Sequence, residues 1–433
     1  MTPITIGIIG LIVLFILLFM GLPVGVSMGL VAAAGLWALL GSNAAFLKMA
    51  ITPIRMVADY NLSVFPLFIL MAQVCSVTGI SRDLYNLAFK WFGRLPGGIA
   101  MATVGACAVF ANISGSTTAC TATVGSIALP EMKRFQYADS LATGATVAGG
   151  SLGIAFPPSF MFILYGILTE TSIGKLFMAA LIPGILQAIF CIITIYVLCR
   201  HNPELGPRGP VTTFKEKINA FGTCGEILAL ILVVLLGIEV GWFTPTEAGS
   251  VGAGGAILFT LIRRRLHWQN FIQACMMAMK TTGMVFLLLI GAYLFTYFIT
   301  VTNIPTALSN TIKGLGVAPM VVIWIIIGTY FLLGTAMEEA SMMLLTIPIF
   351  TPIIVNLGFD QIWFGVLIVR MMQLAMLSPP VGLPLFIVKG IAKDVPMTTI
   401  YKGVIPFIIA DAFHVILIVF VPIITMFLPN LMK

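Results

Sequence analysis

Long apolar runs, separated by short polar stretches, follow one another along the whole of this 433-residue chain. Runs such as 4–20, 176–199, 222–238 and 404–428 have the length that an α-helix needs to cross a bilayer. The runs are continuous, whereas the strands of a membrane β-barrel alternate polar and apolar residues. The pattern therefore predicts an all-α, polytopic membrane protein.

Two of the apolar stretches have polar centres. The stretch 95–132 lies between Arg94 and Lys133, and its middle, 112–118, has the composition of a turn. Basic loops face the cytoplasm, so the chain must return to the side that it left. We therefore predict a re-entrant helical hairpin over 97–130 rather than two full spans. A second hairpin is predicted over 318–356, entered from the opposite face.

Each predicted hairpin is followed by a segment that a double proline interrupts. Pro157-Pro158 lies in 138–168, and Pro379-Pro380 lies in 362–391. Two adjacent prolines break a helix, and a break inside a bilayer is tolerated only where it is buried or lines a wet cavity. A shift of 222 residues superposes the two pairs. The repeated order predicts an inverted repeat, the usual basis of alternating access.

The segments group into four regions, with ten spanning segments and two hairpins in all. We expect N-terminal scaffold helices in 1–92, a first repeat in 93–199, a basic cytoplasmic loop with scaffold helices in 200–300, and a second repeat in 301–433. A single C-terminal helix over 400–428 closes the chain.

The positive charge lies in short loops between the apolar runs. The formal net charge is +7, and 15 of the 22 Lys and Arg residues belong to five loop clusters. This distribution sets orientation in a membrane and does not indicate a nucleic-acid partner. The clusters are Arg82/Lys90/Arg94, Lys133/Arg134, Arg200/Arg208/Lys215/Lys217, Arg263/Arg264/Arg265 and Lys389/Lys393/Lys402.

Enzymatic chemistry is not expected. The seven cysteines have no CxxC or metal spacing, and the three histidines are isolated. The sequence 149–153, GGSLG, fits G-x-S-x-G, but a nucleophile elbow needs a strand–turn–helix setting, so we interpret it as close helix packing. There is no Walker motif. An intramembrane protease, the non-transport alternative, is disfavoured because the aspartates form no convincing pair, and we expect no catalytic residue and no organic cofactor.

Broken helices and hairpin tips expose unpaired backbone groups. Half-helix N-termini attract anions, while half-helix C-termini attract cations such as Na⁺. Ser114, Ser116, Thr117 and Thr118 add hydroxyl oxygens at the first tip. The alternative is that these small residues merely let helices pack closely.

A charged residue within an apolar segment is a functional candidate. Arg370 lies in the middle of 362–378. Two roles stay open: it meets a substrate carboxylate, or it pairs with Glu338 or Glu339 in the second hairpin.

These stretches together resemble the large membrane subunit of a tripartite ATP-independent periplasmic (TRAP) transporter. The similarity is an ordered set that covers essentially the whole chain. It comprises FPLFIL (65–70), GRLPGG (93–98), ISGS (113–116), ALPEM (128–132), AGGSLG (148–153), PPS (157–159), FTPTEA (243–248), PIF (348–350) and PPVG (379–382).

The resemblance implies Na⁺-driven import of a small organic acid, such as a dicarboxylate or a sialic acid, across a bacterial inner membrane. It implies two partners, a small four-helix membrane subunit and a periplasmic substrate-binding protein. It also implies an elevator-type motion, in which hairpins and broken helices slide against a scaffold. A standalone Na⁺/divalent-anion symporter of similar inverted-repeat architecture is the alternative.

The resemblance further implies one Na⁺ site at each tip, facing its broken helix. The first site would involve Asn112, Ser114, Gly115, Ser116, Gly153 and Pro157. The second would involve Gly334, Thr335, Glu338, Ala375 and Ser378. We expect the substrate to contact Ser116, Thr117, Pro158, Ser159, Arg370 and Pro380. The chain departs from the family pattern where it has Arg370, Gln373 and the tip sequence 336–339 (AMEE).

Overall fold

The computed structural model describes residues 2–210, 212–314, 316–334, 337–379 and 382–432. Within these ranges the chain forms α-helices α1–α20 and no strand, which confirms the predicted all-α class. Six helical segments are long and apolar enough to cross a membrane: Tyr60–Val77, Ile173–His201, Phe214–Glu239, Trp268–Val301, Glu339–Asn356 and Met397–Phe420. Shorter apolar helices of 10–17 residues accompany them.

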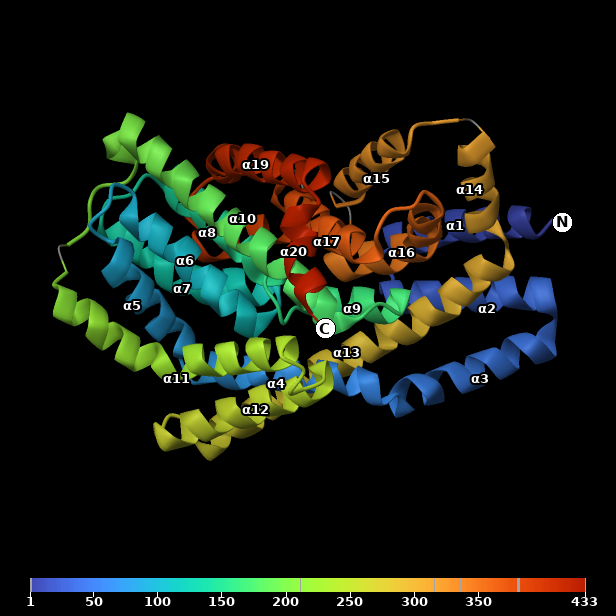
Figure 1. Ribbon diagram of the computed structural model, residues 1–433, viewed down its shortest axis with the longest axis horizontal. Coiled ribbons are helices and arrows are strands. Elements are labelled where there is room, and N and C mark those ends of the chain that lie inside the picture. Colours follow the sequence, from blue (N-terminus) through green and yellow to red (C-terminus); the bar gives the residue numbers. More distant parts are fainter. Residues whose placement is uncertain (1, 211, 315, 335–336, 380–381, 433) are drawn as a thin grey trace.

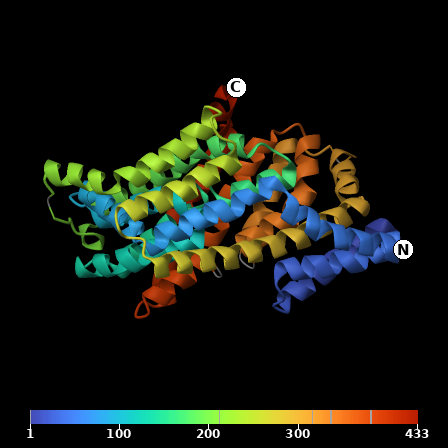
Figure 2. The ribbon, with the colours of Figure 1, turned by 90° about the horizontal axis from the view of Figure 1, so that it is seen from below.

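The first and middle parts of the chain form one side of the molecule. The long helix α13 packs against α2, α3 and α4 along the lower edge of Figure 1. The N-terminal helices α1–α3 lie at one end of the long axis (Figures 1 and 2). These helices are α1 (Pro3–Phe19), α2 (Val24–Leu40), α3 (Ser42–Ala58), α4 (Val64–Val77), α5 (Ile80–Phe92), α11 (Phe214–Glu239), α12 (Pro245–Ile262) and α13 (Trp268–Val301), with the short 3-10 helix η1 (Tyr60–Ser63) before α4.

Two helix pairs and two interrupted helices occupy the positions of the predicted hairpins and breaks. The first pair is α6 (Gly98–Ser114) and α7 (Thr117–Arg134), followed by α8 (Asp139–Ser151), the 3-10 helix η2 (Leu152–Ile154) and α9 (Phe160–Thr169). The second pair is α15 (Pro319–Gly334) and α16 (Glu339–Asn356), followed by α17 (Gln361–Leu377) and α18 (Leu383–Ile391). Prolines without a backbone N–H lie in both gaps.

The remaining helices complete the core and include one correction. Helix α10 (Ile173–His201) is followed by the 3-10 helix η3 (Pro203–Leu205), and α14 (Ile304–Gly314) precedes the second helix pair. The predicted single helix over 400–428 is wrong: α19 (Met397–Phe420) ends before Pro422, and α20 (Ile423–Leu431) is a separate helix. Pro422 lacks the N–H that would continue α19. Helix α20 projects from one face of the molecule (Figure 2).

Close helix packing explains the GGSLG stretch. A Cβ added to Gly150 would overlap the Thr121 hydroxyl on α7, and one added to Gly149 would lie 3.2 Å from Cys107 Sγ on α6. Helix α8 therefore lies against both helices of the first pair, which agrees with our interpretation of this motif.

The five basic clusters lie near one another at the same end of the molecule. Two backbone bonds, Gly97 N to Gly206 O and Gly209 N to Gly93 O, join the first and third clusters. The Tyr137 hydroxyl, just after the second cluster, donates to Pro207 O at 2.8 Å. Ion pairs place the remaining two clusters. Arg265 of the fourth cluster pairs with Asp83, next to Arg82 of the first, and Lys133 of the second cluster pairs with Asp394, next to Lys393 of the fifth. This arrangement is what the positive-inside rule requires of loops on one side of a membrane.

One helix start near these loops has a complete capping box. In α11 the Thr213 backbone N–H donates to Glu216 Oε2 at 2.8 Å, and Glu216 N–H donates to Thr213 Oγ1 at 3.4 Å.

Candidate functional site

The tip of the first helix pair lies directly against the first broken helix. Gly115 ends α6 with a positive φ of 56°, which favours glycine. A Cβ at Gly115 would lie 3.1 Å from Pro158 O and 3.3 Å from Phe160 N. A Cβ at Gly153 would overlap Ser116 O. The structure thus brings together Gly115, Ser116, Gly153 and Pro158, all of them candidates from the sequence.

The other candidates around this tip have varied surroundings. The Asn112 amide donates to Ala108 O of its own helix at 2.8 Å. Ser114 Oγ is buried and has no hydrogen-bond partner among the described residues. Thr117 is fully buried, as is Ser159, whose hydroxyl accepts from Met161 N at 3.3 Å and caps α9. Pro157 is buried in the break itself.

The second tip meets the second broken helix in a similar way. A Cβ at Gly334, the last residue of α15, would overlap the Cβ of Ala375 on α17. Ser378 follows α17, and its hydroxyl donates to Leu374 O at 3.0 Å. Glu338 is the N-cap residue of α16, and its side chain makes no capping hydrogen bond. The candidates Thr335 and Pro380 lie outside the described residues.

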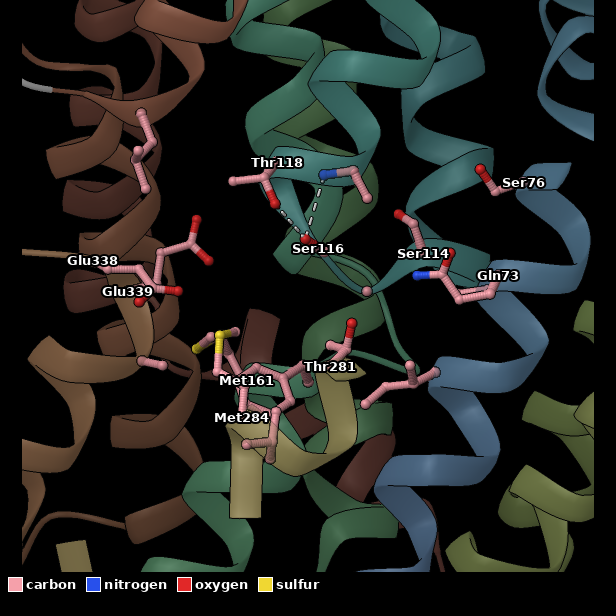
Figure 3. Close-up of a pocket in the computed structure, with 18 of the residues that line it drawn as sticks. Gln73, Ser76, Ser114, Ser116, Thr118, Met161, Thr281, Met284, Glu338 and Glu339 are labelled. Atoms are coloured by element: carbon pink, nitrogen blue, oxygen red, sulfur yellow. Dashed lines mark hydrogen bonds between the residues drawn. The ribbon is translucent and has the colours of Figure 1, made fainter. Parts of the chain in front are cut away.

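A cavity of about 330 Å³ lies where the two tips approach helices α4, α9 and α13. Its described lining includes Ser114, Gly115 and Ser116 from the first tip and Glu338 and Glu339 from the second. Figure 3 shows the two glutamates on one side, with Ser116 and Thr118 across from them. Further polar side chains are Gln73, Ser76 and Thr281. Such a mixed, concave site suits a small organic molecule.

Arg370 does not line this cavity. Its side chain is 0% exposed and donates to Gln373 Oε1 at 3.0 Å and to Ala155 O at 3.1 Å. Gln373 in turn donates to Ser151 Oγ at 3.2 Å. These bonds join α17 to the break region of the first half, so the recorded partners of Arg370 are not Glu338 or Glu339.

Sequence reasoning missed a buried polar cluster beside Arg370. Asp411 and His414 on α19 are both 0% exposed, and Gln187 on α10 is 1% exposed. Asp411 interacts electrostatically with Arg370, and Gln187 lies next to Asp411. The signal was present, because Asp411 is a charged residue inside an apolar run, which marks a functional or structural pair.

The fold and site define a class of protein. Two hairpin-like tips, two interrupted helices and a cavity lined by both polar and apolar side chains, within a bundle of membrane-length helices, define a multi-pass membrane transporter. The model of the family described as "Tripartite ATP-independent periplasmic transporter, DctM component" matches residues 11–424. The chain belongs to this TRAP large-permease family, which confirms the resemblance found in the sequence.

Several relatives match the chain over most of its length, and their names give different substrates. The C4-dicarboxylate TRAP transporter large permease protein DctM of Pseudomonas aeruginosa is 32% identical over 372 residues, 86% of each chain. The sialic acid large permease protein SiaM of Vibrio cholerae is 29% identical and covers 96% of each chain. The 2,3-diketo-L-gulonate large permease protein YiaN of Escherichia coli is 30% identical, over 94% of this chain and 97% of that one.

A solved structure shares the fold. The crystal structure of the Alcanivorax borkumensis YdaH transporter matches with a TM-score of 0.68 and covers 88% of this chain and 89% of that chain. The sequences are 13% identical, so this likeness concerns the fold alone.

Proposed function

We propose that this chain is the membrane permease of a bacterial inner-membrane TRAP system that imports a small organic acid by coupling to Na⁺. The observation that carries the proposal is the convergence of both tips on one cavity, each tip packed against its own broken helix. In such an arrangement, half-helix ends supply binding groups from the backbone.

The tips fit a weakly held monovalent cation. At the first tip Ser114 Oγ is buried without a partner, and Ser116 O faces Gly153, where no side chain intervenes. The tip also follows the C-terminal end of α6, whose unpaired carbonyls attract cations. At the second tip the ends of α15 and α17 meet at Gly334 and Ala375. Sodium would supply the driving force, and the chain would supply these oxygens.

The cavity also fits a moving transport unit. Helices α4 and α13, which we place in the scaffold, form one part of its lining, and the two tips, with the first turns of α9 and α18, form the rest. Sliding the tips along these helices would carry a bound molecule between the two faces of the membrane. A periplasmic binding protein would deliver the substrate, and a small four-helix membrane subunit would be the membrane partner.

The test is uptake of labelled organic acids into proteoliposomes. The vesicles would contain this chain and the small membrane subunit, with the periplasmic protein outside, with and without an inward Na⁺ gradient. The proposal expects uptake that needs both the gradient and the periplasmic protein. Uptake by this chain alone would favour the standalone symporter, and uptake without a gradient would refute Na⁺ coupling.

A further inference from the structure

The charged side chains that face the cavity are acidic, which is unfavourable for a substrate that is purely anionic. Glu338 and Glu339 line the cavity, and its described lining contains no Lys, Arg or His. Their carboxylates lie together on one side of the cavity in Figure 3. A dicarboxylate held there would meet like charge in a poorly solvated space.

One carboxylate oxygen of Glu339 lacks a hydrogen-bond donor in the described part of the chain, although the Thr117 hydroxyl lies close to the carboxylate. The residue is 6% exposed, and its Oε1 has no hydrogen-bond partner among the described residues. Its neighbour Glu338 makes no capping bond either. A buried carboxylate oxygen without a donor is costly. A cationic donor on a bound molecule would supply both the hydrogen bond and the opposite charge.

The opposite side of the cavity suits a carboxylate. Helix α7 begins at Thr117, and the positive end of its dipole lies beside Ser116, Thr118 and Ala119, which line the cavity. The hydroxyls of Ser116 and Thr118 lie 3.0 Å apart. The Ser116 hydroxyl accepts from the Ala119 N–H, so this end offers a ligand the remaining N–H groups of the first turn and one hydroxyl donor, whereas the glutamate side offers acceptors.

The apolar part of the cavity lining suits an organic ligand better than a bare metal ion. Phe110, Phe160, Met161 and Met284 are part of its lining. Hard cations take a close shell of oxygen ligands, which these side chains do not provide. Aromatic rings do attract ammonium groups. A small organic cation is therefore the better partner for the glutamates.

We propose that the substrate is a small zwitterion, an organic acid that also carries an ammonium-type group. Its carboxylate lies at the N-terminus of α7, and its cationic group lies at Glu338 and Glu339. This proposal rests on the proposed function and adds the substrate class.

The test compares probes matched in length but differing in charge. The full chain, reconstituted in nanodiscs at fixed Na⁺, would be titrated with β-alanine against malonate, γ-aminobutyrate against succinate and δ-aminovalerate against glutarate, and binding would be followed by thermal shift. We expect amino acids to stabilise the wild type and the paired dicarboxylates not to do so. Glu339→Gln should weaken amino-acid binding by about 10- to 100-fold, the usual effect of losing a charged hydrogen bond.

Glu339→Gln has a second expected effect, which a misfolded protein would not show. Glu339→Gln should strengthen binding of the dicarboxylates, because one repelling charge is gone. Glu216→Gln is the matched control, since this exposed glutamate caps α11 and glutamine also serves in a capping box. It should bind all probes like the wild type.

Three outcomes would overturn the proposal. They are stabilisation of the wild type by dicarboxylates, no stabilisation by any amino acid, and equal amino-acid binding by wild type and Glu339→Gln. The last would leave Glu339 to another role, such as carrying a proton. Sodium-driven uptake that needs the periplasmic protein is measured separately, so the proposed function can survive the loss of this proposal.

Discussion

Arg370 offers the sharpest test of how the two halves are held together. Arg370→Met removes the donors to Gln373 Oε1 and Ala155 O, and it leaves the buried Asp411 without its opposite charge. Arg370 and Asp411 attract each other electrostatically but form no ion pair or hydrogen bond, so Asp411 contributes less than the roughly 3–5 kcal/mol of a contacting buried pair broken from one side. The two orphaned oxygens cost about 1–3 kcal/mol each, and relief of the desolvation of arginine acts against these losses.

A double variant tests whether Arg370 and Asp411 stabilise each other directly. Replacing both Arg370 and Asp411 by apolar residues removes both buried charges, and such replacements are often neutral in stability. We therefore expect Arg370→Met/Asp411→Leu to be clearly more stable than Arg370→Met alone. A non-additive double-mutant cycle is the signature of direct coupling.

Thermal unfolding in detergent, followed by fluorescence, would measure these differences. Because the unfolding entropy is about 2.1 cal/mol/K per residue, 1 kcal/mol corresponds to about 1 °C in a 433-residue chain, so Arg370→Met should melt roughly 2–6 °C below the wild type. The double variant should recover much of that loss. An unchanged melting temperature in Arg370→Met, or strictly additive effects, would refute the reasoning. Abolished uptake in a variant with wild-type stability would instead indicate that Arg370 contacts the substrate.

Three further predictions concern the tips and the basic end of the molecule. Gly153→Ala should destabilise the protein and reduce uptake, because the added Cβ would overlap Ser116 O. Gly254→Ala is the control and should melt and transport like the wild type, since no atom lies within 4 Å of its added Cβ. Equal behaviour of the two variants would contradict the packing. Ser116→Ala should raise the Na⁺ concentration needed for half-maximal uptake, and an unchanged Na⁺ activation curve would exclude its hydroxyl as a ligand. Because Lys133 lowers the pKa of the exposed Asp394, that ion pair contributes stability above about pH 4, the usual pKa of aspartate, and loses it as the pH falls through the lowered pKa. Asp394→Asn should therefore lower the melting temperature at neutral pH but not at the acid end, and a difference that persists there would rule this pair out as its source.

The sequence predicted the class of fold and the gaps between helices because those depend on local chemistry. Apolar runs require helices in a membrane, and adjacent prolines cannot continue one. As predicted, the interruption after α8 and the interruption after α17 each fall at a double proline. The end of α19 was missed because a single proline is compatible with a kinked helix, and Pro183 and Pro406 lie inside helices in this same chain.

The partners of Arg370 could not be predicted, because they come from distant segments. Ala155 belongs to the first half, and Asp411 lies on α19, beyond the second broken helix. Hydrophobic periodicity carries no information about which segments meet. The same limit applies to the cavity: sequence reasoning identified Glu338 and Ser116 separately, and the structure shows that they line one space.

The hydrogen bond between Ser151 and Gln373 joins residues 222 positions apart, the same spacing that superposes the two double prolines. Each residue is therefore the counterpart of the other in the predicted repeat. If the predicted repeat has a two-fold relation, counterparts can touch only near its axis, and this bond would mark where the axis passes through the protein. A motion that exchanges the roles of the two halves leaves an axial contact in place. We therefore expect substitutions here to change the stability of the inward-facing and outward-facing forms equally, without shifting the balance between them.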